Sequence, residues 1–225
     1  IPPESKLILT FCAKDILLEQ IWTHSNNWNG SESFWDDIAS YAGHAAINTK
    51  GIRDIDASMS IEYSCFADAP RMDHVINIKR NIISAHELSK RGVPIILDAI
   101  VRTDMDLDRI LTWGREQNVS WYLLNFQRTK AVSWVTKLIS HRIERILAAG
   151  GKAIVSGIAN PSMIKELIGR YRGHIAFTNT VVSMKTNYYR ELNQGHWQQS
   201  RLTGKELFQH NLYQYCKATG LKIDQ

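Results

Sequence analysis

The sequence predicts an α/β fold in which short strands alternate with helices. Short apolar runs, each long enough for one strand, are separated by longer segments with helical periodicity. Glycine follows several of those segments, where a helix would end. This order predicts parallel strands joined by right-handed crossovers. With about seven strands expected, a (β/α) TIM-like barrel, incomplete or irregular, is the first choice, and a doubly wound parallel sheet is the alternative.

The first part of the chain contains three of the expected strands. They are short apolar runs at residues 6–12, 45–49 and 58–62. An apolar stripe predicts a helix over residues 15–24, and Ser33 is a suitable N-cap for a short helix over residues 33–40.

The middle of the chain continues the alternation. A long helix is expected from Pro70 to the stop at Gly92, with a buried stripe made of Met72, Val75, Ile76, Ile82, Ile83 and Leu88. Further strands are expected at residues 94–100, 120–124, 152–156 and 174–177. Further helices are expected at residues 104–117, 129–149, 161–171, 183–192 and 203–219.

Composition indicates one folded domain. The 225 residues, of which 44% are apolar, suffice for a substantial core. We therefore expect a single barrel-like domain over residues 1–225, with the C-terminal helices at about residues 183–219 packing on it.

The net charge and the cysteines indicate which binding partners and which cellular location to expect. The formal charge of +5 permits contact with DNA or RNA. Three widely spaced cysteines favour a reducing, cytoplasmic location, and the absence of Cys-x-x-Cys and His-x-x-x-His motifs argues against structural zinc. No apolar run is long enough to cross a membrane, and no P-loop or Gly-x-Gly-x-x-Gly motif occurs.

Two carboxylates mark the expected catalytic site. Glu62 and Asp98 each end a strand, and two strands joined by one helix lie side by side in a parallel sheet. Ligands bind at the carboxyl edge of such sheets. The pair could divide acid–base or nucleophilic roles, or hold a divalent metal through oxygen ligands. The structural alternative is a solvated strand end, or ion pairs with Arg80 or Arg102.

Polar residues near the strand ends are candidates for substrate binding. Amide side chains can bind a base edge and arginine can bind phosphate, although any loop after a strand is polar by default. On the long helix, two of the candidates share a face with Asn81, and that cluster could equally be an ordinary polar helix surface. The candidates are Ser64, Asn77, Arg80, Arg102, Asn125, Gln127, Asn160 and Asn179.

The C-terminal region mixes basic and aromatic residues. Lys185, Arg190, Trp197 and Arg201 could bind nucleic acid by phosphate contact and base stacking. The alternative is an amphipathic helix whose aromatic side chains pack on the core.

The segment from Ser58 to Asp98 resembles an uncharacterised family carried by phages and bacterial mobile elements. Weaker matches lie before it at Trp35 and Tyr41 and after it over Val155–Pro161, so that together the resemblance covers about half the chain. It implies common ancestry and no particular activity. The matching positions are Glu62 (an Asp in the family), Ser64, Asp68, Pro70, Asn77, Arg80, Asn81 and Gly92.

A fainter likeness is to the barrel of tRNA-guanine transglycosylases and their DNA-modifying relatives. It consists of a strand-end carboxylate, a long helix, a strand ending in Asp98, and a later Gly157-Ile158-Ala159-Asn160 unit. The resemblance implies base exchange by two strand-end aspartates, one acting as nucleophile and one as acid or base. This chain departs from the family because Glu62 stands where an aspartate is expected and because the family's cysteine-rich zinc site is missing.

Three functional hypotheses follow from the sequence. The first is a transferase that acts on a nucleobase or nucleotide-linked substrate through Asp98 and Glu62. The second is a nucleic-acid-binding module of a phage or mobile element, without catalysis. The third is a scaffold that binds other protein subunits in a larger assembly.

Overall fold

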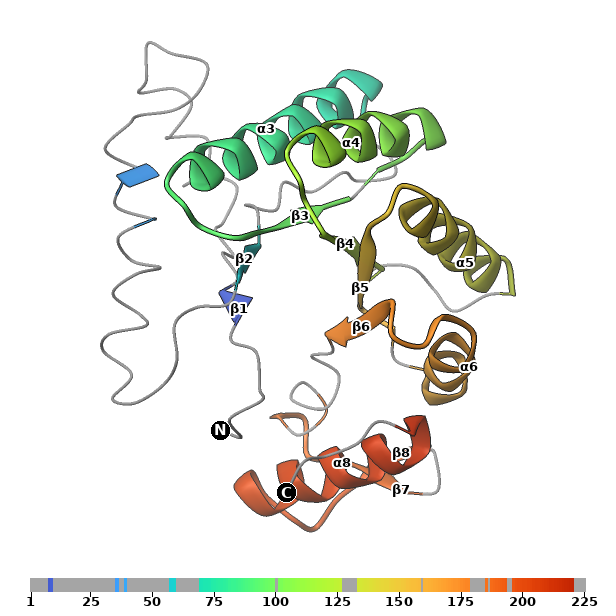
Figure 1. The fold of residues 1–225 in the computed structure, drawn as a ribbon. Helices are drawn as coiled ribbons and strands as arrows, with labels where there is room; N and C mark the ends of the chain where they lie inside the picture. Colours follow the sequence, from blue (N-terminus) through green and yellow to red (C-terminus); the bar gives the residue numbers. More distant parts are fainter. Residues whose placement is uncertain are drawn as a thin grey trace. The chain divides into compact units, whose positions relative to one another are not determined.

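The computed structural model describes residues 8–9, 35–36, 39, 57–59, 69–99, 101–126, 133–158, 160–178, 185, 187–193 and 196–220. The chain divides into two compact units (Figure 1). The first contains Ile1–Leu124 and Ala148–Gly151, and the second contains Asn125–Leu147 and Lys152–Gln225. The expectation that residues 1–225 form one domain stays a prediction.

Four parallel strands follow one another in chain order, and they belong to the first unit except for Asn125, the last residue of the fourth strand, which belongs to the second unit. They are β1 (Ile8–Leu9), β2 (Ala57–Met59), β3 (Ile95–Asp98) and β4 (Trp121–Asn125), and each pairs with the next. This order continues in one direction without a reversal, as in a (β/α) barrel, whereas a doubly wound sheet reverses its order at a switch point. The α/β class and the parallel strand order are therefore confirmed.

Two helices alternate with the last strands of this unit. α3 (Arg71–Lys90) lies between β2 and β3 in the chain and packs on β3, and α4 (Asp104–Glu116) connects β3 to β4. Figure 1 shows α3 and α4 side by side. Trp35, Asp36 and Ala39 are helical within the short helix that was expected over residues 33–40. The helix expected over residues 15–24 and the strand expected over residues 45–49 lie outside the described residues.

The buried face of α3 differs from the predicted stripe. Met72 is 66% exposed and Val75 is 38% exposed, so the stripe is wrong at the start of the helix. The residues that do face the core recur at alternating spacings of four and three, which is the period of one helix face. Some of them are polar, and an assignment by hydrophobicity alone therefore missed the face. They are His74, Ile78, Asn81, Ala85 and Leu88, and Ser84 and Glu87 are buried beside them.

The second unit begins with regular β-α-β structure. α5 (Ser133–Ala148) is followed by β5 (Lys152–Ser156), α6 (Pro161–Tyr171) and β6 (Ile175–Thr178). β5 and β6 are parallel neighbours, with Val155 opposite Phe177. These elements confirm the prediction for this region, and residues 127–132, where the first of its helices was expected to begin, lie outside the described residues.

The C-terminal part of the second unit contains a hairpin that was not predicted. β7 (Arg190–Asn193) pairs antiparallel with β8 (His196–Gln199), and α8 (Gly204–Thr219) packs against β7 and α6. The helix expected over residues 183–192 is therefore wrong from Arg190 onward. Two residues separate the strands, which is the shortest common hairpin connection.

Candidate active site at a strand end

Asp98 is the last residue of β3 and is fully buried. Its exposed fraction is 0%, and it lies opposite Leu123 of β4. The next residue, Ala99, donates its N–H to the Leu123 carbonyl over 2.8 Å, so the pairing of the two strands continues past Asp98. Backbone hydrogen bonds therefore fix the position of this carboxylate at the carboxyl edge of the sheet.

The burial of the Asp98 side chain requires an energetic explanation. Removing an ionised carboxylate from water is costly unless other groups stabilise it. Asp98 takes part in an interaction with other groups of the protein. Buried carboxylates at strand ends are frequent in active sites because neighbouring groups can adjust their acidity for proton transfer or nucleophilic attack.

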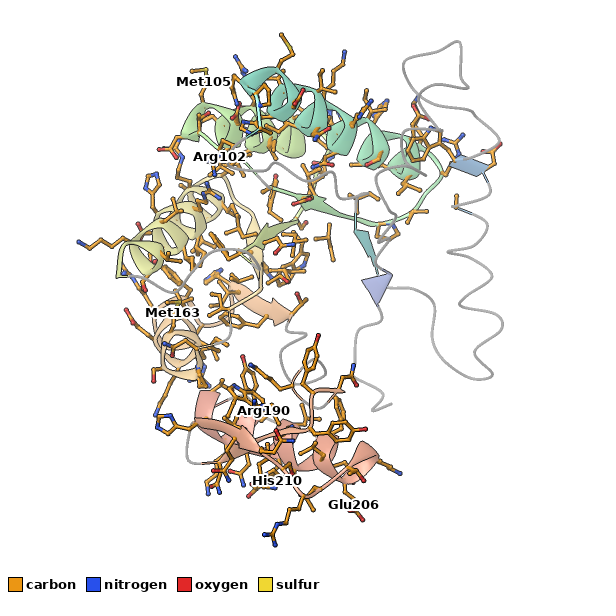
Figure 2. All side chains as sticks on the ribbon, turned by 180° about the vertical axis from the view of Figure 1, so that it is seen from behind. Arg102, Met105, Met163, Arg190, Glu206 and His210 are labelled. Carbon is orange, nitrogen blue, oxygen red and sulfur yellow. The ribbon has the colours of Figure 1, made fainter. Side chains whose placement is uncertain are left out.

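Arg102 lies four residues beyond Asp98, just before α4. Its side chain is exposed, and it forms no hydrogen bond or ion pair with the part of the chain that the structure describes. Figure 2 labels Arg102, together with Met105 of the first turn of α4. A guanidinium group in this position is available to bind an anionic group such as phosphate.

The segment that carries Arg102 is anchored at its far end. The carboxylate of Asp106 accepts hydrogen bonds from the Arg71 guanidinium at 2.6 and 2.7 Å and from the Thr103 hydroxyl at 2.8 Å. Thr103 also caps α4, since its Oγ1 accepts the Asp106 N–H. The hydrogen bonds from Arg71 hold the pKa of the Asp106 carboxyl below its usual value, although burial opposes this effect. This cluster joins the first turns of α3 and α4, and none of its residues was among those predicted from the sequence.

Two candidate residues, Asn77 and Arg80, lie in the second and third turns of α3. Both are half-buried and both interact with other groups of the protein. Asn81, which was expected to share their face, is fully buried, and the Ser84 hydroxyl donates to its backbone carbonyl. Asn81 is thus part of the core, whereas substrate binding by Asn77 and Arg80 stays a prediction.

Four of the candidate residues lie outside the described part of the chain. They are Glu62, Ser64, Gln127 and Asn179. The pairing of Glu62 with Asp98 therefore stays a prediction.

The second unit contains two further candidates. Asn125 is the last residue of β4 and is half-buried. Asn160 is the N-cap of α6, and its side-chain oxygen accepts the N–H groups of Ser162 at 2.9 Å and Met163 at 3.3 Å. The oxygen of Asn160 thus has a structural role, while its amide nitrogen could still contact a ligand.

The four residues predicted to bind nucleic acid differ in exposure. Arg190 and Arg201 are exposed, whereas Lys185 and Trp197 are half-buried. Trp197 lies opposite the buried Leu192 on the same face of the hairpin. Nucleic-acid binding by this group stays a prediction.

The described residues contain no group of three or more His, Cys, Asp or Glu side chains that could hold a metal ion. None of the described helices combines the length and the apolar character needed to cross a membrane.

Comparisons with known proteins identify no family. No protein family matches the sequence, and no curated protein matches it. KGPDC from Streptococcus mutans is similar over 94% of this chain and 85% of its own, with a TM-score of 0.39 and 11% identity. A second structure of KGPDC from the same organism, a ligand complex, gives a TM-score of 0.38 and 9% identity, over 74% of this chain and 68% of that one. The putative copper homeostasis protein CutC from Streptococcus agalactiae gives a TM-score of 0.36 and 11% identity, over 78% of this chain and 99% of its own.

Proposed function

We propose that the protein is an enzyme that acts on a nucleobase or nucleotide-linked substrate, with Asp98 as a reacting carboxylate. The observation that carries the proposal is the complete burial of Asp98 at the carboxyl end of β3, within parallel strands that follow one another in chain order. A structural role alone would be met at lower cost by an apolar residue, because burying a carboxylate requires compensating polar contacts.

The substrate class is inferred from the kinds of polar residue that the sequence places after the expected strands. Arg102 provides an exposed cation for phosphate. Amide side chains such as those of Asn125 and Gln127 have the donor and acceptor pattern that binds a base edge. The likeness to tRNA-guanine transglycosylases supports the same class of substrate.

The proposed reaction is base exchange at a glycosidic carbon. One carboxylate oxygen forms a bond to the anomeric carbon as the bond from that carbon to the base nitrogen breaks, and the departing base takes a proton from a second acid. The incoming base then displaces the carboxylate and gives up a proton to the same second group. We assign these two roles to Asp98 and Glu62 as a pair, without dividing them.

Ligand-dependent thermal shifts test the proposal. We would measure the melting temperature of the intact chain with nucleobases, nucleoside monophosphates and short RNA and DNA oligonucleotides, each with and without Mg²⁺ or Mn²⁺. We expect stabilisation by at least one of these ligands. Asp98→Asn should remove the shift, while Asp73→Asn, which alters an exposed acid in the first turn of α3, should retain it.

A second variant, at an exposed position, distinguishes loss of binding from loss of the fold. Arg102→Gln changes an exposed side chain, so the fold should persist. We expect it to weaken binding of phosphate-bearing ligands about tenfold or more and free nucleobases very little. Equal binding of every ligand by the wild type, Asp98→Asn and Arg102→Gln would refute the proposal.

A further inference from the structure

The two long edges of the β7–β8 hairpin differ. Tyr189 and Ser200 extend the hairpin, since the Ser200 N–H donates to the Tyr189 carbonyl over 2.9 Å. In an antiparallel ladder, hydrogen-bonded and non-hydrogen-bonded pairs alternate. The pairs Glu191–Gln198 and Asn193–His196 are therefore the hydrogen-bonded ones, and the residues between them direct their backbone groups away from the partner strand.

The outer edge of β7 is closed by α8. The Leu192 N–H donates to Asn211 Oδ1 over 2.7 Å, and Asn211 Nδ2 donates to the Arg190 carbonyl over 2.7 Å. The side-chain amide of Asn211 thus forms hydrogen bonds with the same backbone groups of β7 that a neighbouring strand would bind. Nε2 of His210 lies 3.3 Å from the Leu192 carbonyl on the same edge. Figure 2 shows Arg190 on the hairpin and His210 on α8.

The outer edge of β8 has no partner strand among the residues that the structure describes, and it is called the open edge below. Alternation directs the N–H and C=O groups of Trp197 and Gln199 to this edge, because their partners Leu192 and Arg190 bond to Asn211. Nothing in the described part of the chain forms a hydrogen bond with these four backbone groups. β8 has the sequence His-Trp-Gln-Gln, so it contains neither lysine nor proline, the residues that commonly prevent pairing at an edge.

We propose that this open edge binds an extended peptide with acidic side chains, which adds a third strand to the hairpin. Strand addition satisfies the free backbone groups of Trp197 and Gln199, and side chains next to the edge then select the partner. This site is independent of the reaction proposed at Asp98.

The charges beside the edge favour carboxylates. Arg190 lies opposite Gln199 and is exposed, and Arg201 is exposed two residues beyond Gln199. Neither arginine forms an ion pair with any residue that the structure describes. The nearby carboxylate of Glu191 lies on the other face of the hairpin, where it accepts hydrogen bonds from Gln198 and Ser200 at 2.7 Å each. A partner carboxylate on the Arg190 face therefore meets positive charge.

Two other occupants fit less well. Nucleic-acid phosphates accept hydrogen bonds and donate none, so they leave the carbonyl groups of Trp197 and Gln199 unsatisfied. A second copy of this chain brings its own Arg190 and Arg201 to the edge, and two chains that each carry a formal charge of +5 repel each other.

The test uses a defined probe and the full chain. The probe is a fluorescein-labelled peptide Glu-Thr-Val-Thr-Val-Glu with blocked ends, and binding is measured by fluorescence anisotropy. Two matched peptides serve as controls, one with lysine in place of both glutamates and one with N-methylated valines. We expect both controls to bind about tenfold or more weakly than the probe, because one loses the charge complementarity and the other loses its backbone donors.

Variants of the protein test separately the contributions of the backbone hydrogen bonds and of the two arginine charges to peptide binding. Gln199→Pro removes one edge N–H but no bond of the hairpin itself, and should weaken probe binding about fivefold or more. The double variant Arg190→Gln with Arg201→Gln should weaken it by a similar factor, and Lys217→Gln, an exposed charge near the end of α8, should leave it unchanged. Amide hydrogen exchange should show that the probe slows exchange at Trp197 and Gln199, whereas Gln198 is already protected in the free protein.

Several outcomes would overturn the proposal. These are the absence of probe binding, equal binding of the lysine peptide, and binding that leaves exchange at Trp197 and Gln199 unchanged. Concentration-dependent dimerisation that protects these two amides would assign the edge to a second copy instead. Competition by an oligonucleotide that abolishes probe binding and itself protects the two amides would assign it to nucleic acid.

Discussion

Replacing Asn211 by alanine should destabilise the C-terminal hairpin. Asn211 is fully buried and bonds to two backbone groups of β7, the Leu192 N–H and the Arg190 carbonyl. Asn211→Ala removes both bonds at once, and no other residue in the described part of the chain bonds to the Leu192 N–H or to the Arg190 carbonyl.

The size of the effect follows from the surroundings of each backbone group. Leu192 is 1% exposed, so its N–H would lose its partner without access to water, which costs about 1–3 kcal/mol. Arg190 is exposed, so its carbonyl can bond to water and the loss there is about 0.5–1.5 kcal/mol. The higher helix propensity of alanine offsets about 0.5 kcal/mol of this loss in the free energy of unfolding. The expected net loss in free energy of unfolding is about 1–4 kcal/mol.

Urea denaturation followed by circular dichroism measures this loss, with Gln209→Ala as the control at an exposed position on the same helix. Hydrogen exchange provides a local readout, because the Leu192 amide should exchange faster in Asn211→Ala than in the control. A variant with the stability of the control and an unchanged Leu192 amide would show that Asn211 does not close the edge of β7.

Two further predictions concern the first unit. The lowered pKa of Asp106 means that its ionised form is stabilised in the folded state, so this contribution is present above the ordinary carboxyl pKa and is lost as pH falls through the folded value. Urea titrations should show that the free energy of unfolding of the wild type decreases below about pH 4. Asp106→Asn should be less stable than the wild type at pH 7, and its free energy of unfolding should decrease less as the pH falls. If the free energies of the two proteins fell in parallel with pH, the role of Arg71 would be contradicted. Gly114→Ala would bring a Cβ against the hydroxyl of the buried Tyr122 and to within 2.9 Å of two of its ring carbons, so thermal denaturation should show a loss of about 1–2 kcal/mol. Tyr122→Phe removes the hydroxyl and should recover part of this loss, whereas a gain in stability on Gly114→Ala would refute this packing.

The regular β-α elements could be predicted because local signals agreed with each other. β5 and α6 match the predicted residues, since glycines precede the apolar strand and Asn160-Pro161 provides a cap and a first helical turn. The hairpin could not be predicted in this way. Arg190–Asn193 lacks an alternating apolar pattern, and its outer edge bonds to Asn211, a residue distant in the sequence.

The position of the candidate site in the fold could be predicted from the sequence, whereas the burial of Asp98 and the residues around it could not. The apolar run before Asp98 and its place before a helix located the carboxylate at the carboxyl end of a strand, as observed. Its burial, and the cluster of Arg71, Thr103 and Asp106 beside the next helix, depend on packing between segments that sequence spacing does not specify. Similarly, the capping role of Asn160 required the positions of the α6 amides.

The most direct test of the account measures base exchange by the intact protein. An RNA or DNA oligonucleotide is incubated with isotopically labelled nucleobases, and mass spectrometry of the released nucleosides reports incorporation. We expect incorporation with the wild type and with Asp73→Asn, and a rate about 100-fold or more lower with Asp98→Asn, since a carboxamide is neither a nucleophile nor a proton acceptor of comparable strength. A folded Asp98→Asn variant that exchanges bases at the wild-type rate would contradict the central claim that Asp98 is the reacting carboxylate.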